Sequence, residues 1–292
     1  MTVSTTSPHT SSARAPQPPE GSSLYYAWRL VPTRRQAALR AWWQWWHEIS
    51  SIPFDVQDPG VAETKLRWWL QEVQQATQGQ AQHPTTQYLF SEATRDVLMA
   101  HPEWLTTQIE GQIQLVHQTR WLDEASLNRH IEQTTSQACV AAAALLGATT
   151  PEAWTAAKQL GQGIRQAHQL ARLGQDARAG WVHVPIDVLQ QHDVKAHELT
   201  KPAPQAGPNW PKLRTHLCQQ ATQHIRAGLQ GIRALPRRQR RALVPLIALA
   251  HMQLGLLDVI NVGNDRILHE RLLLTPVRKW WIAAQVRLGW LR

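Results

Sequence analysis

The sequence predicts an all-α protein, and three observations carry this prediction. Beyond residue 22, apolar residues recur almost throughout at the three-and-four spacing of a helix face. We find no convincing run of the alternating, β-branched residues that are typical of strands. The breaks between the periodic segments are short. With 292 residues, 43% of them hydrophobic, the chain can bury a substantial core in one or two domains.

The periodic segments begin and end at recognisable helix signals. Pro32 and Thr33 precede the first segment, and Gly79 ends the second. Pro151 and Pro276 open later segments, since proline is favoured in the first turn of a helix. The segments are 33–51, 58–78, 86–100, 102–117, 122–146, 151–173, 186–198, 212–235, 236–262 and 276–291. We therefore expect a single bundle of about ten helices.

Residues 1–22 differ in composition from the rest of the chain. They are rich in Ser, Thr and Pro and contain no apolar stretch, so we expect a disordered tail rather than a secretory signal. The Pro-rich segment 200–211 could mark a domain boundary, but neither side of it shows a shift in composition. We therefore predict one domain over residues 23–292, with 200–211 as a surface loop.

Charge and cysteine content restrict the cellular compartment and the binding partners that we expect for this protein. The chain has 30 Lys and Arg against 21 Asp and Glu, a net charge of +9. We interpret the dense basic cluster at 233–241 as a solvated turn between helices. Because zinc-finger spacing and RNA-binding aromatic motifs are missing, a nucleic-acid-binding module is a distant alternative. The two cysteines, Cys139 and Cys218, favour a reducing, cytoplasmic setting.

Two features bear on membranes. The uncharged runs 139–150 and 242–257 are shorter than the ~20 apolar residues of a spanning helix, so any membrane contact is expected to be peripheral. Segment 278–292 mixes Trp with Arg and Lys, as interfacial helices do. Contact of this segment with the inner face of a membrane, and its burial as a final core helix, both remain open.

Several segments, in consistent order, resemble the squalene/phytoene synthase family. They are GSSLYYA at 21–27, KLRWW at 65–69, HPTT at 83–86 and GQDARAGWVHVP at 174–185. The resemblance runs from about residue 20 to 292, and bacterial hopanoid-pathway squalene or presqualene diphosphate synthases are the nearest subgroup. It implies a class I terpenoid synthase fold, with the helices around a central cavity. The Trp-rich stretches at 42–46 and 68–69 could then line that cavity or fill the core.

The resemblance also implies a chemistry that this sequence does not fully support. Family members join two prenyl diphosphates head to head, using two aspartate-rich helical motifs that hold Mg²⁺ against the diphosphate. The first motif falls on 50–55, where Ser50, Ser51 and Phe54 replace aspartates and Asp55 keeps an acid. We expect the two serines to form local hydrogen bonds. Pro53 is expected to disturb or end this helix.

The second motif falls on Arg172 and Asp176, so one acid is kept and the other has reversed its charge. The two residues are expected to pair at i and i+4. An arginine in a metal site repels the ion, so we predict no metal site and no cofactor. Mg²⁺ is expected only if the chain is an active enzyme. His130 and Gln253 stand where the resemblance implies cavity tyrosines.

The substitutions favour a family member that has lost prenyl transfer and binds an isoprenoid diphosphate, another lipid or a partner protein. The alternative is an active prenyltransferase that converts two farnesyl diphosphates to presqualene diphosphate or squalene. The basic side chains at these positions suit phosphate and could replace the positive charge of the metal. Alternatively, these side chains could merely be tolerated in a cavity that no longer binds a ligand. The candidate substrate-binding residues are Ser23, Arg165, His168, Arg172, Asp176 and Arg178.

Overall fold

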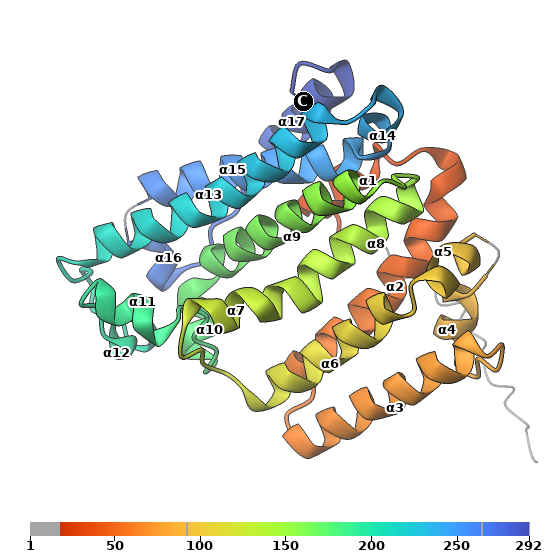
Figure 1. Ribbon diagram of the computed structural model, residues 1–292. Helices are drawn as coiled ribbons and strands as arrows, with labels where there is room; N and C mark the ends of the chain where they lie inside the picture. Colours follow the sequence, from red (N-terminus) through yellow and green to blue (C-terminus); the bar gives the residue numbers. More distant parts are fainter. Residues whose placement is uncertain (1–17, 92, 264, 292) are drawn as a thin grey trace, which may run out of the picture.

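The computed structural model describes residues 18–91, 93–263 and 265–291, so residues 1–17 of the predicted tail lie outside the described part. The described residues form helices joined by short turns (Figure 1). The helices are α1 (Ser23–Trp28), α2 (Thr33–Asp55), α3 (Pro59–Thr77), α4 (Pro84–Leu89), α5 (Arg95–Ala100), α6 (Glu103–His117), α7 (Glu124–Ile131), η1 (Glu132–Ser136), α8 (Gln137–Leu146), α9 (Pro151–Ala171), α10 (Leu173–Arg178), α11 (Ile186–Gln191), α12 (Ala196–Thr200), α13 (Trp210–Ala234), α14 (Arg237–Ala242), α15 (Val244–Val262), α16 (Arg266–His269) and α17 (Pro276–Leu288). Within these ranges the extended structure is one isolated bridge, between Arg120 and Val182. The all-α prediction is confirmed.

The long helices begin at caps that the sequence encodes. Asp58 accepts a hydrogen bond from the Val61 amide before α3, and Thr150 and Thr275 cap α9 and α17 in the same way. Each cap is followed by a proline, whose fixed φ suits the first helical turn. The α8 and α17 helices end at glycines with positive φ, a conformation that favours glycine.

Helix α9 is the centre of the fold. It lies between α8 and α13 in Figure 1 and also packs against α15. Close approach requires glycines: a Cβ on Gly163 would lie 2.7 Å from the Ala221 carbonyl oxygen of α13, and one on Gly228 would lie 2.8 Å from the Ala156 carbonyl oxygen. One core cluster surrounds α9, α13 and α15, and a second joins α2, α3, α6 and α8. These two cores enclose the space between α2, α8, α9 and α15.

Four predicted helices are broken in the structure, each for a local reason. Segment 86–100 divides into α4 and α5, where the Thr94 hydroxyl donates to the Leu89 carbonyl and competes with the helical bond. Segment 186–198 divides at Asp193, whose φ of 50° lies in the left-handed region. Segment 236–262 divides before α15, which carries Pro245 in its first turn. Helices α1, α10 and α16 were not predicted.

The fourth interruption is a π-helical turn, η1, inside the predicted helix 122–146. Its neighbours are close: a Cβ on Gly111 would lie 2.6 Å from Thr134 Cγ2, and one on Gly161 would lie 2.5 Å from Ser136 Cα. A π turn widens the helix by one residue, and these two glycines provide the room. The Thr134 hydroxyl donates to the His130 carbonyl within this turn.

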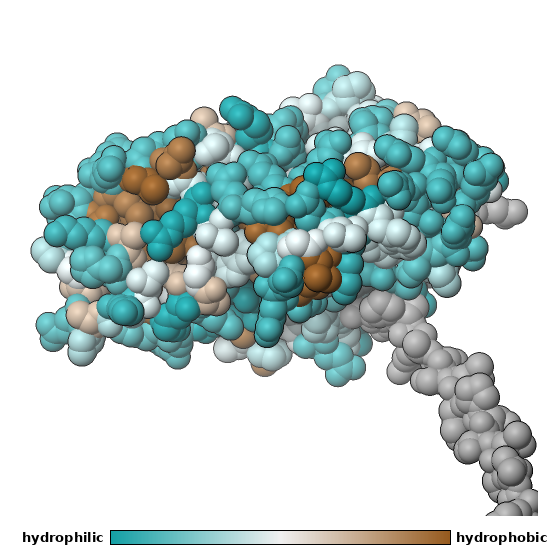
Figure 2. Space-filling model, turned by 90° about the horizontal axis from the view of Figure 1, so that it is seen from below, coloured by the Kyte–Doolittle hydropathy of each residue, from teal (hydrophilic) through white to brown (hydrophobic). Residues whose placement is uncertain are grey.

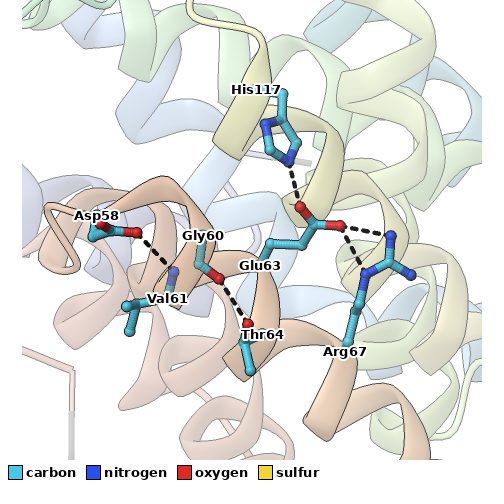
Figure 3. Close-up of polar contacts among 7 residues, drawn as sticks. All are labelled: Asp58, Gly60, Val61, Glu63, Thr64, Arg67 and His117. Atoms are coloured by element: carbon cyan, nitrogen blue, oxygen red, sulfur yellow. Dashed lines mark hydrogen bonds and ion pairs between the residues drawn. The ribbon is translucent and has the colours of Figure 1, made fainter.

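Polar contacts join the outer helices. Glu63 of α3 accepts from Arg67 on the same helix and from His117 of α6, with His117 Nε2 and Glu63 Oε2 2.7 Å apart (Figure 3). The hydrogen bonds from Arg67 and His117, and then the charges of these two partners, lower the pKa of Glu63. The face seen in Figure 2 is largely hydrophilic, and its apolar patches are separated by polar side chains.

Helix α15 bears on the expectation that any membrane contact is peripheral. The run 242–257 was expected to be too short to span a bilayer, yet among the described residues α15 is long and apolar enough by length and composition. Of its most apolar window, 61% is buried inside the protein. It packs against α9, α13 and α17 as a core helix does. A core helix and a membrane-spanning helix are both apolar on all sides, because each is surrounded by apolar groups.

Candidate functional site

A cavity of about 350 Å³ lies between α1, α2, α8, α9 and α15 and reaches the segment before α17. Its apolar lining comes from α1, α2, α8 and α15, and includes Leu39, Trp42, Trp43 and Trp46 of α2. Its polar side chains include Ser23, Arg165, His168, Gln253, Arg271 and Lys279. Among the described residues that line it there is no Asp or Glu. The cavity is therefore apolar along one wall and cationic along another.

The Trp-rich stretch of α2 serves the cavity and the core together. Trp43 and Trp46 are 5.3 Å apart between ring centroids and line the cavity, and their indole nitrogens have no hydrogen-bond partner among the described residues. Trp45 is fully buried in the core. Both interpretations of this stretch are thus correct for different residues, because successive positions of a helix face different directions.

The cationic wall carries charges that repel one another. Burial, together with the charge of Arg172, lowers the pKa of Arg165 to about 10, although Asp176 acts in the opposite direction. Burial and then the charge of Arg165 lower the pKa of His168 to about 3, so this imidazole is neutral at pH 7. Within the described part of the chain, Arg165 makes no hydrogen bond or ion pair. Arg165 is half-buried, and none of the described acids pairs with it directly.

Lys279 and Arg271 complete the cationic wall from the C-terminal segment. Lys279 is buried, and its Nζ donates to the Gly21 carbonyl at 2.7 Å. Burial and the charge of Arg271 lower the pKa of Lys279, and burial and the charge of Arg172 lower that of Arg271. Neither residue was among those predicted for the site. They are distant from α9 in the chain, and only the packing of α17 on α15 and α1 brings them to the cavity.

Asp176 is occupied by protein partners. Arg172 Nε lies 3.0 Å from its Oδ1, which confirms the predicted pair, and His183 Nε2 lies 3.6 Å from its Oδ2. Burial raises the pKa of Asp176, but the hydrogen bond from His183 and the charge of Arg172 outweigh it and lower the pKa overall. The described cavity lining includes neither Arg172 nor Asp176. The charges of Arg172 and Asp176 nevertheless influence the pKa values of Arg165 and His168, although neither residue lines the cavity.

Arg178 has a structural role. It was predicted to bind substrate, but it does not line the cavity, and its guanidinium donates to the carbonyls of Leu268 and His269 at 2.6 and 3.0 Å. These bonds fasten α16 to α10. Of the predicted substrate-binding residues, the structure brings Ser23, Arg165 and His168 to the cavity.

The first degenerate motif lies outside the cavity lining. The Ser50 and Ser51 hydroxyls donate to the carbonyls of His47 and Glu48 at 3.3 and 3.4 Å, which confirms the predicted local hydrogen bonds. Phe54 is exposed and packs against Trp181, with ring centroids 5.0 Å apart. Asp55 is exposed at the last position of α2, which ends two residues after Pro53.

These residues do not fit Mg²⁺. The ion needs oxygen ligands with negative charge, while here two hydroxyls bond to their own helix and the remaining acid of the second motif is paired with an arginine. Groups of three or more His, Cys, Asp or Glu that could hold a metal ion are not found in the described ranges. We therefore assign no metal-dependent step to these residues.

Two positions expected in the cavity differ in outcome. Gln253 lines it, is 6% exposed, and its Oε1 has no hydrogen-bond partner. His130 instead packs on Trp121, with ring centroids 4.8 Å apart, and the described lining excludes it. A π turn follows His130 directly, and no local pattern of residues predicted it.

Comparison with known proteins agrees with this architecture. The model of the squalene/phytoene synthase family matches residues 18–278. A phytoene synthase from Thermus thermophilus is 32% identical over 142 residues, 46% of each protein, so the chain spans about half the length of this curated relative. A dehydrosqualene synthase structure aligns with a TM-score of 0.73 at 15% identity, over 92% of this chain and 91% of that one. A squalene synthase from Alicyclobacillus acidocaldarius gives 0.71 at 15% identity, over 82% and 87%.

Proposed function

The chain belongs to the squalene/phytoene synthase family, and we propose that it binds a lipid with a phosphate or diphosphate head and an isoprenoid-like chain. We further propose that it does so without Mg²⁺-dependent head-to-head prenyl transfer. The observation that carries the proposal is the cavity lining, which combines an apolar tryptophan wall with Arg165, His168, Arg271 and Lys279 and has no acid among its described residues.

Electrostatics supports an anionic head group. Burial lowers the pKa values of Arg165, Arg271 and Lys279, and the charge of a neighbouring arginine lowers each of them further. An anion in the cavity relieves this repulsion, and a guanidinium presents paired donors that match phosphate oxygens. Fixed cations can thus supply the charge compensation that Mg²⁺ supplies in an aspartate-lined site.

The cavity dimensions support one lipid chain. Ligand pockets commonly measure about 300 to 1,000 Å³, so a cavity of about 350 Å³ lies at the lower end of the range. Head-to-head transfer requires two prenyl chains in one site. The tryptophan wall provides a large, rigid apolar surface for a single chain.

Two assays on the purified full chain test the proposal. We expect farnesyl diphosphate to bind in the presence of EDTA, measured by isothermal titration calorimetry, more tightly than either inorganic pyrophosphate or farnesol. We expect no product by extraction after incubation with farnesyl diphosphate, Mg²⁺ and NADPH. Squalene or presqualene diphosphate formed by the wild type and abolished in Asp176→Ala would establish the active-enzyme alternative.

Matched variants localise the binding. Arg165→Met removes the central cation and should weaken farnesyl diphosphate binding about tenfold to hundredfold, since a hydrogen bond to a charged group is worth about 1.5 to 3 kcal/mol. Lys65→Met removes an exposed cation of α3 and should leave the affinity unchanged. Ala142→Trp should abolish binding by filling the cavity. Equal affinities in the wild type and Ala142→Trp would place the ligand elsewhere.

A further inference from the structure

The outer face of α17 is apolar although the helix lies at the surface. Its inner face buries Lys279, Ile282, Ala283 and Val286. The outer face carries Val277, Trp280, Trp281 and Leu288, with Trp290 just beyond the helix, and the exposed fraction ranges from 46% for Trp281 to 76% for Val277. Positions 277, 281 and 288 recur at helical spacing, so these side chains form one stripe along the helix. We call this stripe with its flanking cations the α17 face.

The charge around the stripe has a single sign. At about 100° per residue, Arg278 and Arg287 fall on opposite sides of a stripe centred on Val277 and Leu288. Residues 271–291 contain four cations, Arg271, Arg278, Lys279 and Arg287, and no Asp or Glu. The α17 face is thus an exposed row of tryptophan and aliphatic side chains with arginines along both edges.

The α17 face adjoins the lipid cavity. Leu273, three residues before the helix, is 56% exposed and also lines the cavity. Arg271 is exposed and lines the cavity too, while Lys279 reaches it from the inner side of α17. The rim of the cavity and the apolar stripe therefore belong to one continuous segment of chain.

We propose that the α17 face docks on the surface of an anionic lipid bilayer. Trp280, Trp281 and Trp290 would enter the head-group region, where tryptophan is favoured, and Arg278 and Arg287 would contact lipid phosphates. The cavity rim at Leu273 then lies beside the bilayer. Because docking uses the outer side of α17, it does not require that the cavity hold a ligand.

Charge distinguishes a bilayer from a second copy of the chain. A symmetric dimer through this face would bring Arg278 and Arg287 against the same residues of the other copy, with no acid in the segment to pair them. Anionic lipid supplies the missing negative charge at every position along both edges. A bilayer is therefore the occupant that satisfies the apolar stripe and the arginines together.

Flotation with the full chain tests this surface. We expect binding to vesicles of phosphatidylglycerol and phosphatidylcholine, weaker binding as salt rises, and little binding to pure phosphatidylcholine. Arg278→Gln with Arg287→Gln should lower the vesicle affinity about 25-fold, at about fivefold for each cation. Lys65→Gln with Arg67→Gln removes the same charge from α3, at the opposite edge of Figure 1, and should change it little.

Tryptophan variants test the apolar stripe. Trp280→Ser with Trp281→Ser should weaken binding at least about tenfold, since each indole loses apolar contact with the bilayer. Trp68→Ser is the control, because this α3 side chain is 44% exposed, close to the 46% of Trp281. Ala142→Trp should bind vesicles like the wild type, so failure of cavity binding and failure of docking are distinguishable.

Three results would overturn the docking proposal. The first is no binding to anionic vesicles, and the second is an equal loss of binding in the α17 and α3 variants. The third is a dimer in light scattering that Trp280→Ser with Trp281→Ser dissociates, which would make a second copy the occupant of the α17 face.

Discussion

Replacing Arg165 by methionine should make the free protein more stable while it weakens the binding of an anionic ligand. Arg165 is a half-buried cation on α9 with no hydrogen bond or ion pair among the described residues, and its pKa is lowered to about 10, mainly by burial. A base whose pKa falls on folding destabilises the folded state in its charged form. Methionine keeps the unbranched apolar stem of the side chain and removes the charge.

The magnitude follows from the pKa. A tenfold change in a protonation equilibrium is worth about 1.4 kcal/mol, so lowering the pKa of an arginine to about 10 corresponds to roughly 3 kcal/mol of destabilisation. The guanidinium faces a cavity that admits solvent, which reduces the effect. We expect the free energy of unfolding of Arg165→Met to exceed that of the wild type by about 1 to 2 kcal/mol.

The pH dependence has a definite sign. The destabilisation is fully present below the folded pKa of about 10 and is relieved only as the pH rises above it. The difference between variant and wild type should therefore be constant from about pH 6 to pH 9. Denaturant unfolding at both pH values, monitored by tryptophan fluorescence, measures it.

Arg178 provides the control for this experiment. Its guanidinium donates to two backbone carbonyls, so Arg178→Met should lower the free energy of unfolding by about 1 to 3 kcal/mol. If Arg165→Met were destabilising to the same extent, Arg165 would be a structural residue and the account of an uncompensated cation would be wrong.

Three further predictions concern pH and packing. His168→Gln should reduce the loss of stability between pH 7 and pH 5 by about 2 kcal/mol. The reason is that the buried imidazole, with a pKa of about 3, stays neutral in the folded protein, whereas in the unfolded chain it is protonated over this pH range. Unfolding curves at both pH values measure the change, and an equal loss of stability in the variant and the wild type would contradict the prediction. Asp176→Asn should lower the free energy of unfolding at pH 7, because the lowered pKa of Asp176 stabilises the folded state above the ordinary carboxyl pKa. That contribution is lost as the pH falls through the lowered value, so the stabilities of the two proteins should converge in acid titrations. Gly163→Ala should lower the free energy of unfolding by about 1 to 3 kcal/mol, because the added Cβ would contact the Ala221 carbonyl. Gly255→Ala should be neutral or stabilising, because the nearest neighbour of its Cβ would be 3.5 Å away. Thermal unfolding measures both variants.

Helix periodicity and capping residues predicted most of the fold. Segments 33–51, 58–78 and 151–173 correspond closely to α2, α3 and α9, because each combines a regular apolar face with a proline at or next to its start. The interruptions at Thr94 and Asp193 escaped prediction, since a side-chain hydrogen bond or a single left-handed residue leaves the apolar spacing intact. The short helices α10 and α16 are too brief to show a period.

The candidate site was predicted in part. Arg165 and His168 are three residues apart on α9, so helical geometry alone places them on one face, and the structure brings both to the cavity. Arg178 has the charge expected of a phosphate ligand, but its partners are carbonyls some 90 residues away in the chain. Arg271 and Lys279 reach the cavity only through tertiary packing, which no local pattern encodes.

The π turn at Glu132–Ser136 gives this family member a way to change its cavity without substituting a residue. One additional residue in the turn rotates the preceding helix by about 100° relative to the following one. His130 packs against Trp121, whereas Thr135, Ala138 and Cys139 line the cavity. Loss of one residue from the turn would rotate α7 relative to α8 and present a different set of side chains to the ligand. Insertions and deletions in this turn would then diversify ligand choice while Gly111 and Gly161 preserve the space that the turn needs.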